Sequence, residues 1–216
     1  RLDALLLLWL GSTATEPSAW KPLPLDWRDR GPVPIAIHRS SWTDPEPLYL
    51  AIKAGSPSAN HAHMDGGSFI LEADGVRWAI DLGPESYHKI ESLGLNLWDR
   101  KQSSDRWRIF RYNSTSHNTL VIDGGLQRAS GRADITGSSD AADWPATVVD
   151  LSPLYAEAAA RVVRTFAMPG RKAVVIRDRL EGLKPGSRVR WAMATRARCA
   201  VEAGRAVLSQ SGRSLT

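Results

Sequence analysis

The residues most able to do chemistry are histidines close together in the sequence. Two of the five histidines form an His-x-His pair, His61 and His63, which is followed by Asp65, Gly66 and Gly67. Alternate residues of an extended backbone point to one face, so we expect both imidazoles to address one small volume. The glycine pair indicates a close backbone approach or a positive φ. This pattern favours a functional loop over a surface loop that is merely rich in histidine.

Two further groups stand at the ends of apolar segments. Asp81 closes the run Trp78-Ala79-Ile80, and His117 precedes the apolar segment 120–122. A carboxylate at such a place must be paired, hydrogen-bonded or bound to a metal if it is buried. Alone, Asp81 would be interpreted as a turn cap and His117 as a polar residue at a strand start. Two imidazoles and one carboxylate together are a plausible ligand set for Zn²⁺.

Composition sets the class of protein. The 216 residues are 43% hydrophobic and 24% charged, which is typical of a globular chain with one sizeable core or two small ones. No apolar run approaches the roughly 20 residues that cross a bilayer. The net charge of +5 is mild and scattered, so we expect an acidic partner but neither a nucleic acid nor a membrane. The single cysteine, Cys199, excludes an intramolecular disulfide framework.

The chain divides into three parts. Residues 1–15 carry the apolar run 5–10 and are expected to form a terminal helix of a preceding domain, although a secretory signal peptide has a similar outline. Residues 16–34 contain prolines at positions 17, 22, 24, 32 and 34 and are expected to form an extended linker. Residues 35–216 show strand periodicity and would be one domain of a longer protein.

Short apolar runs separated by turn residues predict an antiparallel sandwich or barrel with almost no helix. The Asp74-Gly75 pair predicts a hairpin turn, because it accepts the positive φ of a tight turn. Segment 84–107 is polar and weakly helical and is expected to be an excursion over the sheet. The expected strands lie at 35–37, 48–52, 68–71, 76–80, 119–122, on both sides of Pro169-Gly170, and at 187–195.

Four motifs between residues 48 and 127 resemble the C-terminal domain of the heparinase II/III-like polysaccharide lyases, in the order and at the approximate spacing of that family. They lie at residues 51–55 (AIKAG), 60–69 (NHAHMDGGSF), 78–83 (WAIDLG) and 116–124 (SHNTLVIDG). The resemblance implies an all-β, antiparallel β-sandwich packed on an N-terminal (α/α) toroid. Residues 1–15 would then be a remnant of the last toroid helix.

The resemblance also implies site roles. By position, His63, Asp81 and His117 match metal ligands, usually for zinc, and His61 matches a histidine that faces the substrate. Three protein ligands leave a fourth position, which by general rule suggests catalytic zinc. The resemblance instead implies a structural zinc that fixes the loop carrying His61.

The implied reaction is β-elimination in an acidic, uronic-acid polysaccharide. The proton α to the uronate carboxylate becomes acidic only when hydrogen-bond donors neutralise that carboxylate, and each such donor is worth about 2.7–4 kcal/mol in comparable sites. We expect His61 to be such a donor. The resemblance places the proton-transfer groups in the toroid, so the chain alone is expected to be inactive. From their residue types, Tyr87, Arg108 and Arg111 are candidate substrate contacts.

Two other functions stay open. One is a non-catalytic carbohydrate-binding or structural sandwich. The other is a metal-dependent hydrolase that uses the open metal position. By analogy with such lyases, the expected location is the periplasm or the cell exterior, and the expected partners are an acidic polysaccharide and the chain's own toroid.

Overall fold

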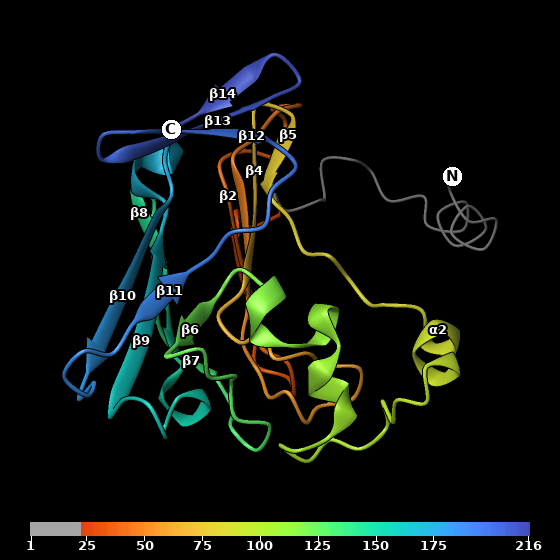
Figure 1. The fold of residues 1–216 in the computed structure, drawn as a ribbon. Coiled ribbons are helices and arrows are strands. Elements are labelled where there is room, and N and C mark those ends of the chain that lie inside the picture. Colours follow the sequence, from red (N-terminus) through yellow and green to blue (C-terminus); the bar gives the residue numbers. More distant parts are fainter. Residues whose placement is uncertain (1–22) are drawn as a thin grey trace, which may run out of the picture.

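The computed structural model describes residues 23–216 and shows two antiparallel sheets that face each other (Figure 1). The first sheet has the strand order β1-β2-β3-β4-β5 and the second the order β10-β9-β8-β7. Smaller sheets pair β11 with β6 and β12 with β13 and β14. The strands are β1 (Asp26–Asp29), β2 (Ile35–Arg39), β3 (Tyr49–Lys53), β4 (Phe69–Ala73), β5 (Val76–Ala79), β6 (Leu120–Ile122), β7 (Asp134–Ala141), β8 (Trp144–Asp150), β9 (Arg161–Ala167), β10 (Val175–Glu181), β11 (Val189–Trp191), β12 (Arg198–Glu202), β13 (Arg205–Gln210) and β14 (Arg213–Leu215).

Helix is scarce, as the sequence predicts. The α-helix α2 (Tyr87–Ser92) lies in the expected excursion, beside the sandwich and away from the second sheet (Figure 1). Short 3₁₀ helices span Asp105–Arg108, Phe110–Tyr112, Ser114–Ser116, Ser152–Leu154 and Pro169–Arg171. Within residues 23–216, no helix combines the length and the apolar character needed to cross a bilayer. The predicted all-β, antiparallel sandwich is thus confirmed.

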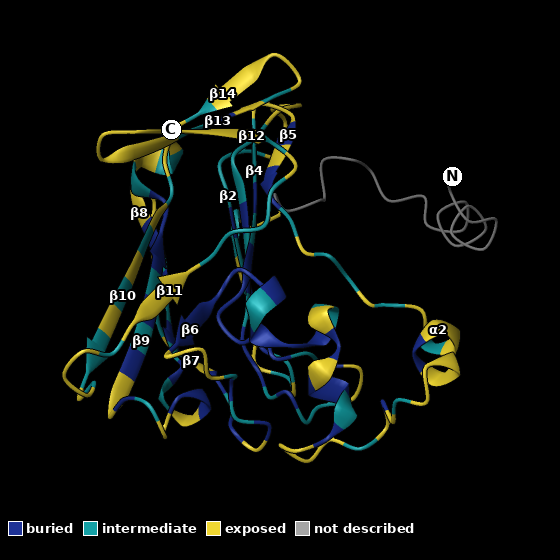
Figure 2. Cartoon of the chain, viewed as in Figure 1, coloured by how far each residue is buried: buried dark blue, intermediate teal, exposed yellow. Residues whose placement is uncertain are grey.

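The core lies between the two large sheets. Burial alternates along β3, β8 and β9, because successive side chains of a strand point to opposite faces. The buried faces meet in the middle, and the exposed faces point outward (Figure 2). Phe69 of β4 and Phe166 of β9 form an edge contact across the gap, with ring centroids 5.9 Å apart. Apolar burial of this kind is the main favourable contribution to folding.

The strands differ from the prediction mainly in number. The Asp74-Gly75 turn joins β4 to β5 with φ of 53° and 71°, so the hairpin is confirmed. The hairpin of β7 and β8 was not predicted from sequence. Strand β7 is polar in sequence and none of its residues is buried, so it lacks the apolar alternation that marks a strand.

The first sheet begins inside the segment predicted to be a linker. Strand β1 pairs with β2 over four residues, so the described part of residues 16–34 contains a strand as well as extended chain. The predicted helix 1–15 and the first part of the linker lie outside the described residues. The toroid remnant therefore stays a prediction.

A buried histidine joins the sheets away from the His-x-His loop. His38 of β2 is fully buried; its Nδ1 lies 2.7 Å from Oδ1 of Asp26 and its Nε2 lies 2.9 Å from the hydroxyl of Thr147 on β8. Arg171 forms a two-pronged ion pair with the same Asp26. Every polar atom of the His38 ring is used, so this histidine has a structural role.

A buried arginine ties the second sheet to the two histidine-bearing loops. Arg164 of β9 is fully buried and forms a bidentate ion pair with Asp178 of β10, at 2.7 and 2.9 Å. Its Nη1 also donates to the carbonyls of Gly67 and Asn118, each at 2.9 Å. One side chain thus holds the loop that contains His63 and the loop that contains His117.

We predict that Arg164→Met lowers the free energy of unfolding by about 3–5 kcal/mol, because it leaves the Asp178 charge buried without its partner. Equilibrium urea unfolding measures this change. The matched control is Arg161→Met, an exposed position of the same strand, where we expect a change within about 0.5 kcal/mol. Equal losses in the two variants would contradict the role given to Arg164.

Candidate active site and metal centre

The loop of residues 60–69 is shaped by its glycine pair. Gly67 has a φ of 78°, and a Cβ there would lie 2.9 Å from a methyl group of Leu151. A Cβ on Gly66 would collide with a methyl group of Leu154. Both predicted reasons for the glycines, close approach and positive φ, are therefore confirmed. Side chains larger than hydrogen would push this loop off the second sheet.

The structure brings His63 and His117 together from two distant segments. Their ring centroids lie 5.3 Å apart, and His117 is 1% exposed. The Nδ1 of His117 lies 2.8 Å from Oδ2 of Asp81, so the three predicted ligands are neighbours. The Nε2 of His117 is buried and has no hydrogen-bond partner within residues 23–216. An orphaned, buried imidazole nitrogen is the kind of atom that a metal ion satisfies.

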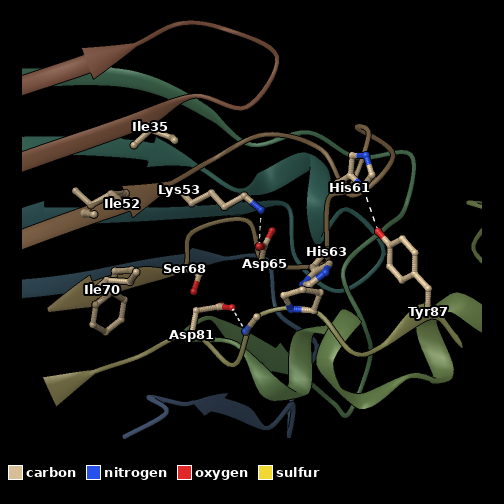
Figure 3. A pocket seen from close by; sticks show the side chains of 14 residues that line it. Ile35, Ile52, Lys53, His61, His63, Asp65, Ser68, Ile70, Asp81 and Tyr87 are labelled. Carbon is tan, nitrogen blue, oxygen red and sulfur yellow. Dashed lines mark hydrogen bonds and ion pairs between the residues drawn. The ribbon is translucent and has the colours of Figure 1, made fainter. Parts of the chain in front are cut away.

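A second carboxylate lies at the same place. One ligand atom each from His63, Asp65 and His117 lie within 4.8 Å of one another. Asp65 is buried and also forms an ion pair with Lys53 (Figure 3). The sequence analysis did not assign a role to Asp65. Asp65 follows His63 by two residues, and alternate residues of an extended chain share a face. This spacing could have predicted that the Asp65 carboxylate lies beside His63.

Both His63 and Asp81 have shifted pKa values. Burial, with a smaller contribution from the nearby His117, lowers the pKa of His63 to about 3. Burial acts to raise the pKa of Asp81, but hydrogen bonding and charge interaction with His117 lower it to about 2. At neutral pH the pair is thus a neutral imidazole and an ionised carboxylate. These are the protonation states that bind a divalent metal.

His61 does not share the geometry of His63. Its φ is 56°, in the left-handed region, and its side chain is exposed. The predicted extended backbone is therefore wrong at His61, although both imidazoles line one cavity. His61 turns instead toward α2, where its Nδ1 lies 3.1 Å from the Tyr87 hydroxyl (Figure 3).

One cavity of about 480 Å³ collects these groups. At one end it is lined by His61, His63, Asp81 and Tyr87, and along its length by apolar side chains of the first sheet such as Ile70. The predicted substrate-facing histidine, two of the predicted ligands and a predicted substrate contact thus line the same space. The third predicted ligand, His117, lies behind His63.

The sequence model described as "Heparinase II/III-like, C-terminal" matches residues 36–216. The chain belongs to the heparinase II/III-like family. A comparison with curated proteins gives no match.

Solved structures of heparinases have the same fold. A mutant of heparan sulfate lyase HepC from Pedobacter heparinus superposes with a TM-score of 0.67 and 18% identity, over 88% of this chain and 28% of that one. A heparinase III gene product gives a TM-score of 0.63 at 17% identity, over 84% of this chain and 26% of that one. A further heparinase III gives 0.58 at 15% identity, over 82% and 26%. The chain therefore spans little more than a quarter of each of these larger proteins.

The two predicted arginine contacts of this heparinase II/III-like domain lie outside the cavity lining. Arg108 is exposed and paired with Asp105 at 2.9 Å, within its own turn. Arg111 donates to the carbonyls of Leu82 and Pro84, which precede α2. Neither residue lines the cavity. Arg111 holds the segment that carries Gly83 and Pro84, so its contact with the site is indirect.

Two buried amides, of Gln127 and Asn118, fix the histidine loops. Gln127 is fully buried; its amide accepts from the backbone N–H of Gly66 at 3.1 Å and donates to the Gly66 carbonyl at 2.9 Å. Asn118 donates to the carbonyls of Phe69 and Ile80 at 2.7 and 2.8 Å. No local sequence pattern marks such residues, since their partners are distant backbone groups.

We predict that chelator-treated protein loses stability as the pH falls below about 6.5, the ordinary pKa of histidine. In the folded state His63 stays unprotonated down to about pH 3. The unfolded state therefore binds more protons than the folded state between pH 3 and pH 6.5. The free energy of unfolding therefore decreases as the pH falls through this window. Asp81 adds a second loss below its ordinary pKa of 3.8, ending at about pH 2. Urea unfolding at a series of pH values measures both.

His63→Gln should flatten this dependence between pH 4 and 6.5, because the titrating imidazole is gone. His88→Gln is the control, since His88 is exposed on α2 and lies outside the cavity lining. A slope that His63→Gln leaves unchanged would show that another group is responsible.

Proposed function

We propose that this chain is the β-sandwich part of a polysaccharide lyase that cleaves uronic-acid-containing glycans by β-elimination. Membership of the heparinase II/III-like family supports the class of reaction. The observation that carries the proposal is the contact between His61 and Tyr87, 3.1 Å apart at the mouth of a cavity that also contains His63. His61 is exposed and Tyr87 is half-buried, whereas His117 behind His63 is buried.

His61 has the geometry for neutralising a uronate carboxylate. With Nδ1 facing the Tyr87 hydroxyl, Nε2 is the nitrogen left for a substrate. Donation from Nε2 to the carboxylate becomes stronger as the α proton leaves and charge develops on the enolate, so this hydrogen bond favours the transition state. Tyr87 orients the ring and sets which nitrogen carries the proton.

The residues around His63 fit a zinc ion. The neutral His63 and the orphaned Nε2 of His117 are suitable nitrogen ligands, and the ionised Asp81 is a suitable oxygen ligand. In the structure Asp81 contacts Nδ1 of His117, the opposite ring nitrogen, whereas Asp65 lies close to both imidazoles. We propose His63, Asp81 and His117 as the ligand set, with Asp65 held by Lys53 beside it. When bound, the ion would have a structural role, joining the loop of His61 to the loop of His117.

We predict that His63→Ala reduces bound zinc from about one ion per chain to about zero and lowers the melting temperature, because metal binding and folding are linked. His61→Ala should leave both quantities unchanged, since His61 points away toward Tyr87. Metal analysis after dialysis and thermal unfolding measure them. Equal zinc loss in both variants would refute this division of roles.

The carboxylate ligand is tested by a matched pair, Asp81→Asn and Asp65→Asn. We expect zinc loss only in Asp81→Asn. The reverse result would assign the oxygen ligand to Asp65, whose carboxylate already lies close to both imidazoles.

We predict that the parent protein releases an unsaturated uronate, detected by its ultraviolet absorbance, and that His61→Ala lowers its kcat by about 10²–10³-fold. His88→Ala, an exposed neighbour of Tyr87, should retain full activity. The 216-residue chain alone should form almost no product, because the resemblance places the proton-transfer groups in another domain. If the parent protein binds acidic glycans but yields no unsaturated product, the domain is a carbohydrate-binding module instead.

A further inference from the structure

A second, small hollow adjoins the cavity. His61 and Tyr87 line both spaces, so this pair forms the wall between them. The far side of the hollow is formed by Trp98, Arg100 and Arg106. None of these three residues has a part in the proposed elimination chemistry.

Trp98 presents a fixed aromatic face. Its side chain is 60% exposed, although a tryptophan of this size is usually covered. The indole Nε1 donates to Glu91 at 3.1 Å, and the ring meets the edge of Tyr87 at a centroid distance of 5.4 Å. The backbone N–H of Trp98 is also held, by Asn96 at 3.0 Å. An exposed ring held at several points can stack on a flat apolar surface without further ordering.

A positively charged side chain, that of Arg100, lines the hollow together with Trp98. Arg100 is exposed, and its two Nη atoms donate to the Ser58 carbonyl at 2.9 Å and to Asn60 at 3.1 Å. These bonds use two of the five N–H donors of a guanidinium and fix its orientation. Within residues 23–216, Arg100 forms no ion pair with a carboxylate.

Arg106 adds a second cation behind the hollow. It is 6% exposed, and its Nη atoms donate to the carbonyls of Leu97 and Ala62 at 2.9 and 2.7 Å. Its charge is also unmatched by any carboxylate of the described part of the chain. Burial lowers the pKa of Arg106, which is the expected effect of a cation without an anion beside it.

We propose that Trp98 and Arg100 form a subsite for an acidic sugar residue next to the one held at His61. The apolar face of the sugar ring stacks on the indole, and its carboxylate or sulfate group accepts from the free N–H groups of Arg100. The inference rests on the proposed function for the direction of the glycan, which passes from the His61 cavity across Tyr87 to Trp98. Trp98 and Arg100 would thus be binding residues that membership of the family does not by itself imply.

The test is a titration of the ¹⁵N-labelled 216-residue chain with a heparan sulfate hexasaccharide, and with neutral cellohexaose for comparison. The nine tryptophans supply separate indole N–H signals, and Trp98→Phe identifies the signal of Trp98. We expect that signal to shift with the acidic ligand. Trp98→Ala should weaken binding roughly tenfold, since it removes the stacking surface.

Charge is tested separately. Arg100→Gln should weaken hexasaccharide binding by roughly fivefold or more and leave cellohexaose binding unchanged. The matched controls are Arg198→Gln and Trp144→Ala, which change an exposed arginine and an exposed tryptophan outside both spaces. Both control variants should bind the hexasaccharide with the affinity of the unsubstituted 216-residue chain.

The subsite proposal fails if the Trp98 signal does not shift with the hexasaccharide, or if Trp98→Ala binds the hexasaccharide as tightly as the unsubstituted chain. These results are independent of the lyase assay. Binding that depends on Trp98 without any unsaturated product would remove the proposed function and leave a glycan-binding site. Full lyase activity with an unchanged KM in Trp98→Ala would leave the function and remove the subsite.

Discussion

The buried guanidinium of Arg164 is the contact on which the site depends, because it holds both histidine-bearing loops at once. It reaches the carbonyls of Gly67 and Asn118 from the opposite sheet, and Asp178 balances its charge. A buried charge is costly unless it is paired and hydrogen-bonded. The loops must therefore dock together in one register, or the guanidinium would be left without partners in the core.

The loops therefore come together through the protein's own hydrogen bonds. Gln127 pairs with both backbone groups of Gly66, and Asn118 bonds the chain at both ends of the β4–β5 hairpin. In small zinc modules the ion supplies the folding energy that the chain lacks. Here the sandwich already has a hydrophobic core, and Arg164 already holds the two histidine-bearing loops together. A metal ion at His63 and His117 would add rigidity to a site that is already assembled.

The sequence was sufficient for features that depend on neighbouring residues. The Asp74-Gly75 hairpin, the glycine pair at 66 and 67, and the clustering of His63 with His117 followed from local spacing and from family resemblance. It was not sufficient where partners are distant. The contacts of Arg164 depend on which strands and loops meet across the sandwich, and no local pattern encodes that. The β7–β8 hairpin and Asp65 are local features that were missed, the first because β7 carries few apolar residues and the second because its spacing from His63 was not used.

His61 shows why spacing alone misjudged the His-x-His pair. Its left-handed conformation separates the two imidazoles, and such a conformation is costly for a residue with a Cβ unless its surroundings enforce it. The chain on both sides is held: Arg106 donates to the carbonyl of Ala62, and Arg100 donates to the side chain of Asn60 and the carbonyl of Ser58. The same two cations that make the neighbouring hollow positive thus also hold His61 outward. Loop conformation and charge are thereby linked, because the arginines that hold the segment of His61 also supply the positive field that an acidic sugar meets.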